Sequence, residues 1–221
     1  MVSRVFVIFI ALFWIAGSAA AQELSVDPDY QACVERIEQD PATGRYEALR
    51  WISDGGGDPA VYCAAVADLA MDLPRLAGGR LQTLAEKNRT LDPYLSARLY
   101  VQAAQAWAAG NETDLALAAI NEADRMAPGA LEVKLLSAPV YAELGRWGLV
   151  KRNLDEAEQI EPLTAPALVL RSRARLQLLD QEGAASDLQQ ALNLQPDNID
   201  GLILRGELAQ SGIVIDSVSR Q

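Results

Sequence analysis

Apolar and polar positions recur along this chain with a fixed period of 34 residues. The segments INEADRMAP (120–128), LDEAEQIEP (154–162) and LQQALNLQP (188–196) each contain a large apolar residue, an alanine three positions later and a final proline. Apolar residues at this spacing predict amphipathic helices, and the proline marks where each helix ends because it cannot continue the helix. A 34-residue period predicts stacked helix pairs, since one pair cannot bury its apolar face alone.

The segment 93–211 resembles the tetratricopeptide repeat (TPR) family. In that family, the second helix of each repeat carries a small residue, a bulky residue and an alanine, and a proline follows. The corresponding residues here are Ala116, Ile120, Ala123 and Pro128; Val150, Leu154, Ala157 and Pro162; and Ala184, Leu188, Ala191 and Pro196. Val150 departs from the small-residue rule. The resemblance implies an all-α fold, a right-handed helical solenoid of about five helix pairs plus a capping helix.

The first helices of the repeats follow the family pattern less closely. Small residues stand at Ala138, Ser172 and Gly206, and Gly145 matches the turn glycine. Gly110 falls one position early, which predicts a turn one residue longer in the first repeat. Pro139 lies inside a helical pattern, so we expect either a kink there or a helix that starts later.

Residues 22–92 keep helical patterning without the proline register, and we interpret them as degenerate helix pairs. The predicted helices cover 28–39, 42–53, 59–71 and 74–87. Asp27-Pro28 and Asp58-Pro59 each offer a capping carboxylate followed by a proline at the first helical position. At the other end, a capping helix is expected at about 198–210, followed by a short tail at 212–221.

The first 21 residues have the features of a cleavable signal peptide. Arg4 is followed by an apolar stretch from Val5 to Ala16, and Ala19 and Ala21 stand in the arrangement that signal peptidase prefers. Cleavage before Gln22 predicts a periplasmic or secreted protein, and the Ala-rich chain resembles bacterial ones. An uncleaved membrane anchor remains the alternative.

Charge and composition exclude several functions. The net charge is −11, and loss of Arg4 makes it more negative, so neither nucleic acid nor an anionic lipid surface is an expected partner. The chain has no histidine, which removes the usual general base and the usual transition-metal ligand. Gly55-Gly56-Gly57 lacks the lysine and the strand of a phosphate-binding loop. We therefore expect no cofactor and no metal.

Cys33 and Cys63 are the two cysteines of the chain. In an exported protein such a pair favours a single disulfide. Cys33 stands five residues, and Cys63 four residues, after the proline that opens the first helix of its pair. First helices of adjacent repeats lie side by side in a TPR array, so the two sulfurs are expected to meet. The alternative is two unpaired buried thiols.

The resemblance implies a non-enzymatic protein-interaction module whose concave groove holds a peptide of a partner protein. The expected groove residues are Leu135, Glu143, Val169, Arg173, Leu176, Ile203 and Glu207. Leu135, Val169 and Ile203 are 34 residues apart and would form an apolar ladder, unless they only line helix packing. Arg171 is expected to pair with Asp187. Trp107, Trp147, Tyr100 and Tyr141 are expected in the core.

Two other functions remain open at this stage. One is a structural subunit of an envelope assembly, which would use the convex face. The other is an enzyme, for which only carboxylates, hydroxyls or a redox-active Cys33–Cys63 pair remain as chemistry. The identity of the partner and the oligomeric state are not encoded in any motif.

Overall fold

The structure, a computed structural model, describes residues 28–210, 212, 213 and 215. The predicted signal peptide, the cleavage point at Gln22 and most of the tail lie outside the described residues. Every regular element in the described part is helical. The helices are α2 (Pro28–Gln39), α3 (Pro41–Ser53), α4 (Gly57–Ala70), α5 (Pro74–Asn88), α6 (Pro93–Ala109), α7 (Thr113–Met126), α8 (Leu131–Glu143), α9 (Trp147–Glu158), α10 (Ala165–Gln177), α11 (Gln181–Leu194) and α12 (Ile199–Gln210).

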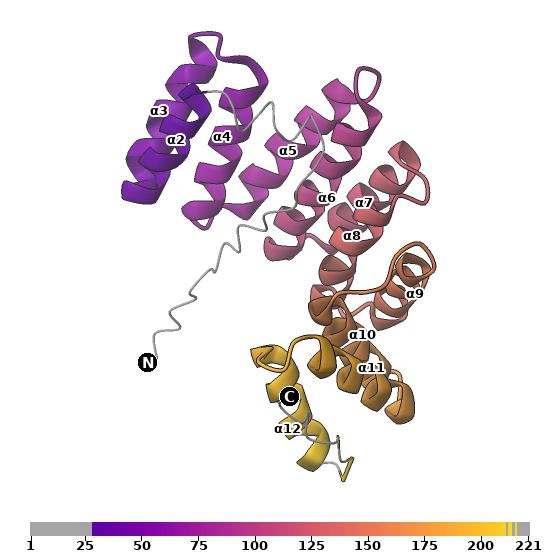
Figure 1. Ribbon diagram of the computed structural model, residues 1–221. Helices are drawn as coiled ribbons and strands as arrows, with labels where there is room; N and C mark the ends of the chain where they lie inside the picture. Colours follow the sequence, from indigo (N-terminus) through magenta and orange to yellow (C-terminus); the bar gives the residue numbers. More distant parts are fainter. Residues whose placement is uncertain (1–27, 211, 214, 216–221) are drawn as a thin grey trace.

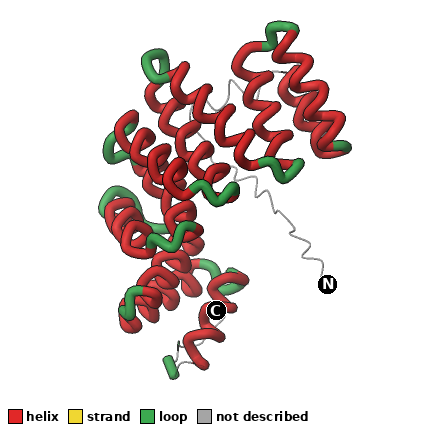
Figure 2. Tube along the Cα trace, turned by 180° about the vertical axis from the view of Figure 1, so that it is seen from behind, coloured by secondary structure: helices red, strands yellow, loops and turns green. Residues whose placement is uncertain are grey.

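The helices form five consecutive pairs, and the unpaired α12 closes the C-terminal end (Figure 1). This confirms the predicted all-α solenoid with a capping helix. The pairs follow one another along an arc, with α7 and α9 on the outside of the bend and α8, α10 and α12 on the inside. Short loops connect the helices at their ends, and both views show the same succession of layers (Figure 2). Among the described residues, no helix has the length and apolarity needed to cross a bilayer.

The 34-residue period governs the C-terminal half of the array. The first helices α8, α10 and α12 begin at Leu131, Ala165 and Ile199, and the second helices α7, α9 and α11 begin at Thr113, Trp147 and Gln181. Helix α6 is longer than its counterparts by about one turn. From α7 onward, the helices therefore start at the 34-residue interval that the sequence pattern predicts.

Small residues at repeating positions let neighbouring helices approach closely. Their side chains have no exposed surface, so no larger residue fits without moving a helix. These residues are Ala104, Ala138 and Ser172 in the first helices, and Ala116, Ala184, Ala123, Ala157 and Ala191 in the second helices. Val150, which departs from the small-residue rule, is also fully buried. The hydroxyl of Ser172 donates a hydrogen bond to the Ala184 carbonyl at 2.7 Å, so the polar group is satisfied inside the core.

The four aromatic residues expected in the core do pack there. Tyr100 and Tyr141 are buried, and Trp107 and Trp147 are half-buried against the same apolar cluster. The Trp107 indole N–H donates to Gln82 Oε1 at 3.1 Å, which satisfies its polar edge.

The prediction of a longer turn in the first repeat is wrong. In each repeat, the turn between the two helices contains one residue in the left-handed region. These residues are Asn111 with a φ of +60°, Gly145 with +68° and Leu179 with +63°. These residues are 34 apart, so all three turns have the same length. Asn111 takes the place of the turn glycine because asparagine tolerates this conformation, while Gly110 has a φ of −80° and no special role.

Two further local expectations concern Pro139 and Asp58. Helix α8 runs from Leu131 to Glu143 through Pro139 and begins in register with α10, so the proline does not delay its start, and the kink stays a prediction. Asp58 does not cap α4, because the helix already begins at Gly57 with Gly56 as the capping residue. The carboxylate of Asp58 instead accepts hydrogen bonds from Lys87 and Asn88 on α5.

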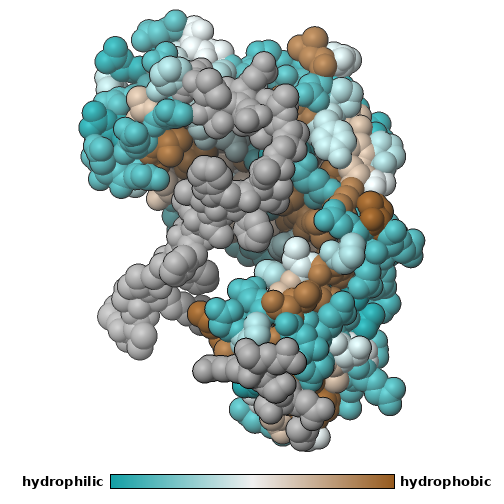
Figure 3. Space-filling view, in the orientation of Figure 1, coloured by the Kyte–Doolittle hydropathy of each residue, from teal (hydrophilic) through white to brown (hydrophobic). Residues whose placement is uncertain are grey.

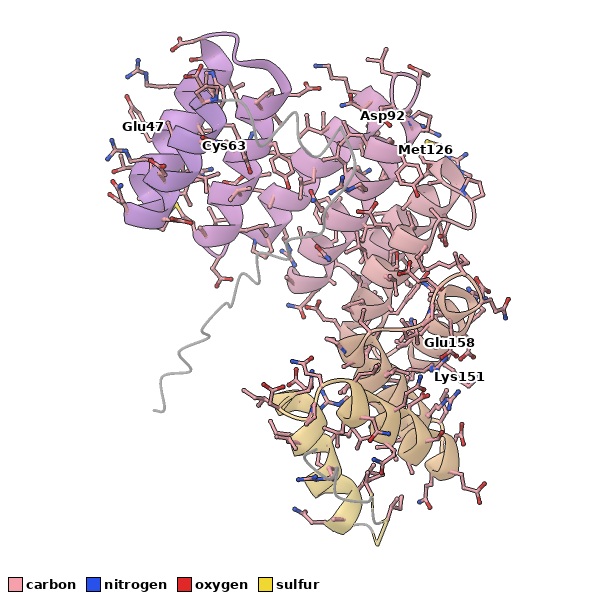
Figure 4. All side chains as sticks on the ribbon, in the orientation of Figure 1. Glu47, Cys63, Asp92, Met126, Lys151 and Glu158 are labelled. Atoms are coloured by element: carbon pink, nitrogen blue, oxygen red, sulfur yellow. A yellow bond between two sulfur atoms is a disulfide. The ribbon has the colours of Figure 1, made fainter. Side chains whose placement is uncertain are left out.

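The N-terminal helices have a small core of their own. The structure joins Cys33 of α2 to Cys63 of α4 in a disulfide, with their Cα atoms 6.5 Å apart (Figure 4). Ile37, Ala48 and Ala64 pack around the bridge, and this cluster is separate from the large core that extends from α4 to α12. Helix α4 contributes to both clusters, so it is the boundary between two hydrophobic units.

A buried carboxylate holds α4 between its neighbours. Asp68 is fully buried, and its two oxygens accept hydrogen bonds from Arg45 Nε of α3 at 2.6 Å and from Arg80 Nε of α5 at 2.7 Å. A buried charge is tolerated when it is paired and hydrogen-bonded in this way. The triad therefore links three successive helices across the boundary between the two clusters.

Leu179 provides a test of the turn geometry. Its side chain is 87% exposed and its φ is positive, so the residue carries backbone strain that no packing compensates. We expect Leu179→Asn to raise the free energy of unfolding by about 0.5–1 kcal/mol, because asparagine tolerates this conformation. Urea denaturation followed by circular dichroism measures the change. The converse variant, Asn111→Leu, should lower stability by a similar amount, and a destabilising Leu179→Asn would contradict the assignment.

The disulfide provides a second test. A bridge that closes a loop of 30 residues should stabilise the protein by about 3–4 kcal/mol through the unfolded chain. Reductant should therefore lower the urea midpoint of the N-terminal helices, and Cys33→Ala with Cys63→Ala should have the same effect. The double variant is its own control, because reductant should change nothing in it. If reductant leaves the urea midpoint of the chain with both cysteines unchanged, the bridge does not form.

Candidate partner-binding face

The inner side of the arc is formed by the first helices of the pairs. Hydrophobic atoms gather in the hollow of the arc, whereas the outer rim is mostly hydrophilic (Figure 3). Such a concave face, built on rigid helices, presents side chains from several repeats to one extended ligand.

Most of the predicted groove residues are accessible to solvent. Ile203, Glu207 and Glu143 are exposed, and Leu135, Arg173 and Leu176 are half-buried. Their role in binding a partner stays a prediction. Partial desolvation by the neighbouring helices raises the pKa of Glu143, although its side chain still reaches solvent.

Val169 does not offer the surface that the apolar ladder requires. It is only 5% exposed, and its Cγ2 lies 3.4 Å from the position that a Cβ on Gly201 would take. The side chain is therefore covered by α12, which approaches closely at the glycine. The ladder of Leu135, Val169 and Ile203 is interrupted at its middle member, where helix packing uses the apolar surface.

Arg171 and Arg173 stand two residues apart and have different roles. Arg171 is 3% exposed, and its Nε and Nη2 donate to the two oxygens of Asp187 at 2.9 and 2.8 Å. This confirms the predicted pairing of Arg171 with Asp187. Arg173 lies half-buried on the predicted groove face, and within the described part of the chain no carboxylate forms a salt bridge with it. Within the described residues, Arg173 is therefore a cation without an ionic partner.

The Arg171 guanidinium is the centre of a network that joins three helices. Besides Asp187 of α11, it contacts Glu158 and Asp155 of α9, with 3.1 Å from Nη1 to Asp155 Oδ1. Burial acts to lower the pKa of Arg171, but the hydrogen bonds that it donates to Glu158 and Asp187 outweigh this effect and raise the pKa above its usual value. Glu158 lies on the outer side of the arc (Figure 4). The network is structural, since it leaves no free donor for a partner.

A pocket of about 280 Å³ opens between α4 and α6, with α5 as its floor. Helix α4 packs on α2, α3 and α5, and its side chains face those of α6 across the pocket. The gap between these two first helices is lined by Tyr62, Ala65, Val66, Leu69, Leu81, Gln102, Gln105 and Ala106. Sequence analysis missed this pocket, because it assigned the groove only to the regular repeats.

A change of period marks the pocket in the sequence. The left-handed turn residues Asp72 and Asn111 are 39 apart, whereas the later ones are 34 apart. When the turn residues Asp72, Gly145 and Leu179 are aligned, Tyr62 of α4 falls at the position of Leu135 in α8. In the same alignment, Val66 falls at the position of Arg173 in α10. The pocket therefore continues the same inner face toward the N-terminus. Most of the extra residues belong to the longer α6, which forms one wall of the pocket.

Gln102 is the polar group of this pocket that lacks a full set of partners. A hydrogen bond joins its side chain to Tyr62, and burial raises the pKa of that tyrosine. The Oε1 atom of Gln102 is buried and has no hydrogen-bond partner among the described residues. In the same part of the chain, no three side chains are grouped to hold a metal ion.

Comparison with known proteins yields matches in solved structures. No family model and no curated protein matches the chain. YrrB, a TPR protein described as having an unusual peptide-binding site, superimposes with a TM-score of 0.57 at 13% identity, over 86% of this chain and all of its own. A TPR protein of Thermus thermophilus superimposes with a TM-score of 0.58 at 18% identity, over 82% of this chain and 97% of its own. The chain therefore has the fold of the tetratricopeptide-repeat proteins.

Proposed function

We propose that this protein is a non-enzymatic interaction module of a bacterial cell envelope, which binds a peptide segment of a partner protein along its inner face. The observation that carries the proposal is the combination of open groups on that face. Arg173 offers an unpaired cation, Ile203 is 52% exposed, and the pocket between α4 and α6 offers an apolar cavity with an unpartnered acceptor. Rigid helices hold all three, and preorganisation of this kind lowers the cost of binding.

The similarity to YrrB supports the same proposal. That protein is described as having a peptide-binding site, and its whole chain superimposes on this one. The low identity means that the residues that contact a ligand have to be argued from this chain alone.

The location in the envelope rests on two observations. The segment 1–21 has the charge, the apolar stretch and the small residues of a signal peptide. The Cys33–Cys63 disulfide fits an oxidising compartment such as the periplasm. Fractionation of cells that express the full chain, with the mature N-terminus read by mass spectrometry, tests both the location and cleavage before Gln22.

The burial of the disulfide argues against a thiol-redox enzyme. Cys63 has no exposed surface and Cys33 is 9% exposed. Thiol–disulfide exchange needs an attacking thiolate to reach one of the sulfur atoms, and burial prevents this. The bridge is therefore proposed to be structural.

A second candidate function is a structural subunit of an envelope assembly. It is favoured by the apolar C-terminal end, where Ile199 is 73% exposed and Leu194 is 59% exposed. Large oligomers of the purified chain on size exclusion would favour this candidate over a monomeric receptor.

The decisive experiment is crosslinking in living cells with the tagged full chain, followed by mass spectrometry of the captured proteins. The variant Arg173→Ala with Ile203→Ala removes an open cation and an exposed apolar side chain from the inner face. We expect capture of a specific partner to fall at least tenfold, because each truncation of a buried interface residue costs on the order of 1–2 kcal/mol.

The matched control is Arg152→Ala with Ile160→Ala. Both residues are exposed, at 61% and 56%, and belong to α9 and the turn that follows it. This variant removes the same two side-chain types away from the inner face, and partner capture should remain at the level of the unchanged protein. Equal capture by the inner-face variant and the control would refute the proposed function.

A further inference from the structure

The pocket between α4 and α6 identifies the chemistry of one ligand side chain. This inference rests on the proposed function, since it concerns a peptide bound along the inner face. The pocket is apolar on most of its surface, where Val66, Leu69 and Leu81 line it. A large apolar side chain is the occupant that such a lining stabilises.

The unpartnered Gln102 Oε1 adds a second requirement. A buried acceptor without a hydrogen bond destabilises the protein, and a ligand that supplies a donor removes this penalty. Because this oxygen has almost no solvent-exposed surface, water does not satisfy it in the unliganded protein, and the Gln102 side chain has to turn toward the pocket to accept the bond. The occupant must therefore combine an apolar body with a hydrogen-bond donor.

The side chains that carry a donor differ in what else they bring into the pocket. Lysine and arginine would bury a charge, and within the described residues the pocket lining contains no carboxylate to pair with it. Phenylalanine and leucine have no donor. The tryptophan indole has a large apolar surface and one N–H, and it has no acceptor that would need a partner of its own.

We infer that the pocket between α4 and α6 binds a tryptophan side chain of the partner peptide, whose indole N–H donates a hydrogen bond to Gln102 Oε1. The bound ring would fill the gap between the two first helices. It would contact Tyr62 and Leu69 on α4 and Ala106 on α6, which lie on opposite sides of the pocket. Because α4 belongs to both hydrophobic clusters, the ligand would also tie the N-terminal unit to the rest of the array.

The test uses three small probes: N-acetyl-tryptophanamide, its analogue methylated at the indole nitrogen, and N-acetyl-phenylalaninamide. Titration into the isotope-labelled mature chain, followed by NMR, reports both the affinity and the residues that respond. We expect the tryptophan probe to bind about tenfold more tightly than the other two, since each of these lacks the donor. The side-chain amide of Gln102 and the backbone amides of Leu81 and Ala106 should shift.

Two variants isolate the hydrogen bond. Gln102→Leu should abolish the preference for the tryptophan probe, because the methylated and unmethylated rings then bind equally. Gln105→Leu is the matched control, since Gln105 also lines the pocket but is exposed, and it should leave the preference unchanged. Circular dichroism spectra of both variants establish that they are folded.

The outcomes separate this inference from the proposed function. Equal affinities for the three probes, or shifts confined to residues outside the pocket, would overturn the tryptophan site. If crosslinking still captures a partner through Arg173 and Ile203, the proposed function survives that result. As a further check, Leu69→Trp places an indole from the chain itself in the pocket, and binding of the tryptophan probe should be lost.

Discussion

Close contact between helix backbones at small buried residues is the constraint on which the rest of this structure depends. Alanines such as Ala116, Ala123 and Ala138 have no exposed surface and no side chain beyond Cβ. They set how near one helix lies to the next, and the large residues Ile120, Leu154 and Leu188 then fill the space between the pairs. Because each contact involves only neighbouring helices, the geometry of one repeat is transmitted to the following one, and an arc results.

Buried charge adds a second kind of connection at two places. Arg171 and Asp68 both lie where an array of this kind would otherwise bury apolar side chains, and each has oppositely charged partners on the helices on both sides. Ion pairs of this type are weak contributors to net stability, because desolvation offsets most of their attraction. They do penalise any arrangement in which the partners separate. They therefore specify the relative positions of three helices where small residues alone leave some freedom.

Local features made much of the fold readable from sequence. The proline after each second helix and the 34-residue spacing predict the succession of helix pairs, because both act over short stretches of the chain. The capping helix follows from the 34-residue register, whereas the disulfide follows from the side-by-side first helices that the family resemblance implies. The wrong local predictions concern positions where another residue type takes the expected role, or where a side chain bonds to a different helix. Asn111 replaces a turn glycine, and Asp58 prefers Lys87 on the next helix to its own helix end.

The inner face was harder to predict because exposure depends on what the next helix does. Val169 and Ile203 occupy equivalent positions, but α12 covers Val169 at Gly201 and no further first helix in the described chain covers Ile203. The pocket is a stronger example. Its lining belongs to the same face, but it coincides with a lengthened α6 and with a change of the period from 34 to 39 residues, which no regular pattern predicts.

The pocket between α4 and α6 lies where the chain departs from the 34-residue period. The irregular N-terminal pairs have only a small core of their own, so they require the Cys33–Cys63 bridge and the Asp68 triad to hold α4 in place. These covalent and ionic restraints act on the helix that forms one wall of the pocket. The departure from the repeat and the features that stabilise the N-terminal unit therefore meet at α4, beside the surface that we propose for ligand binding.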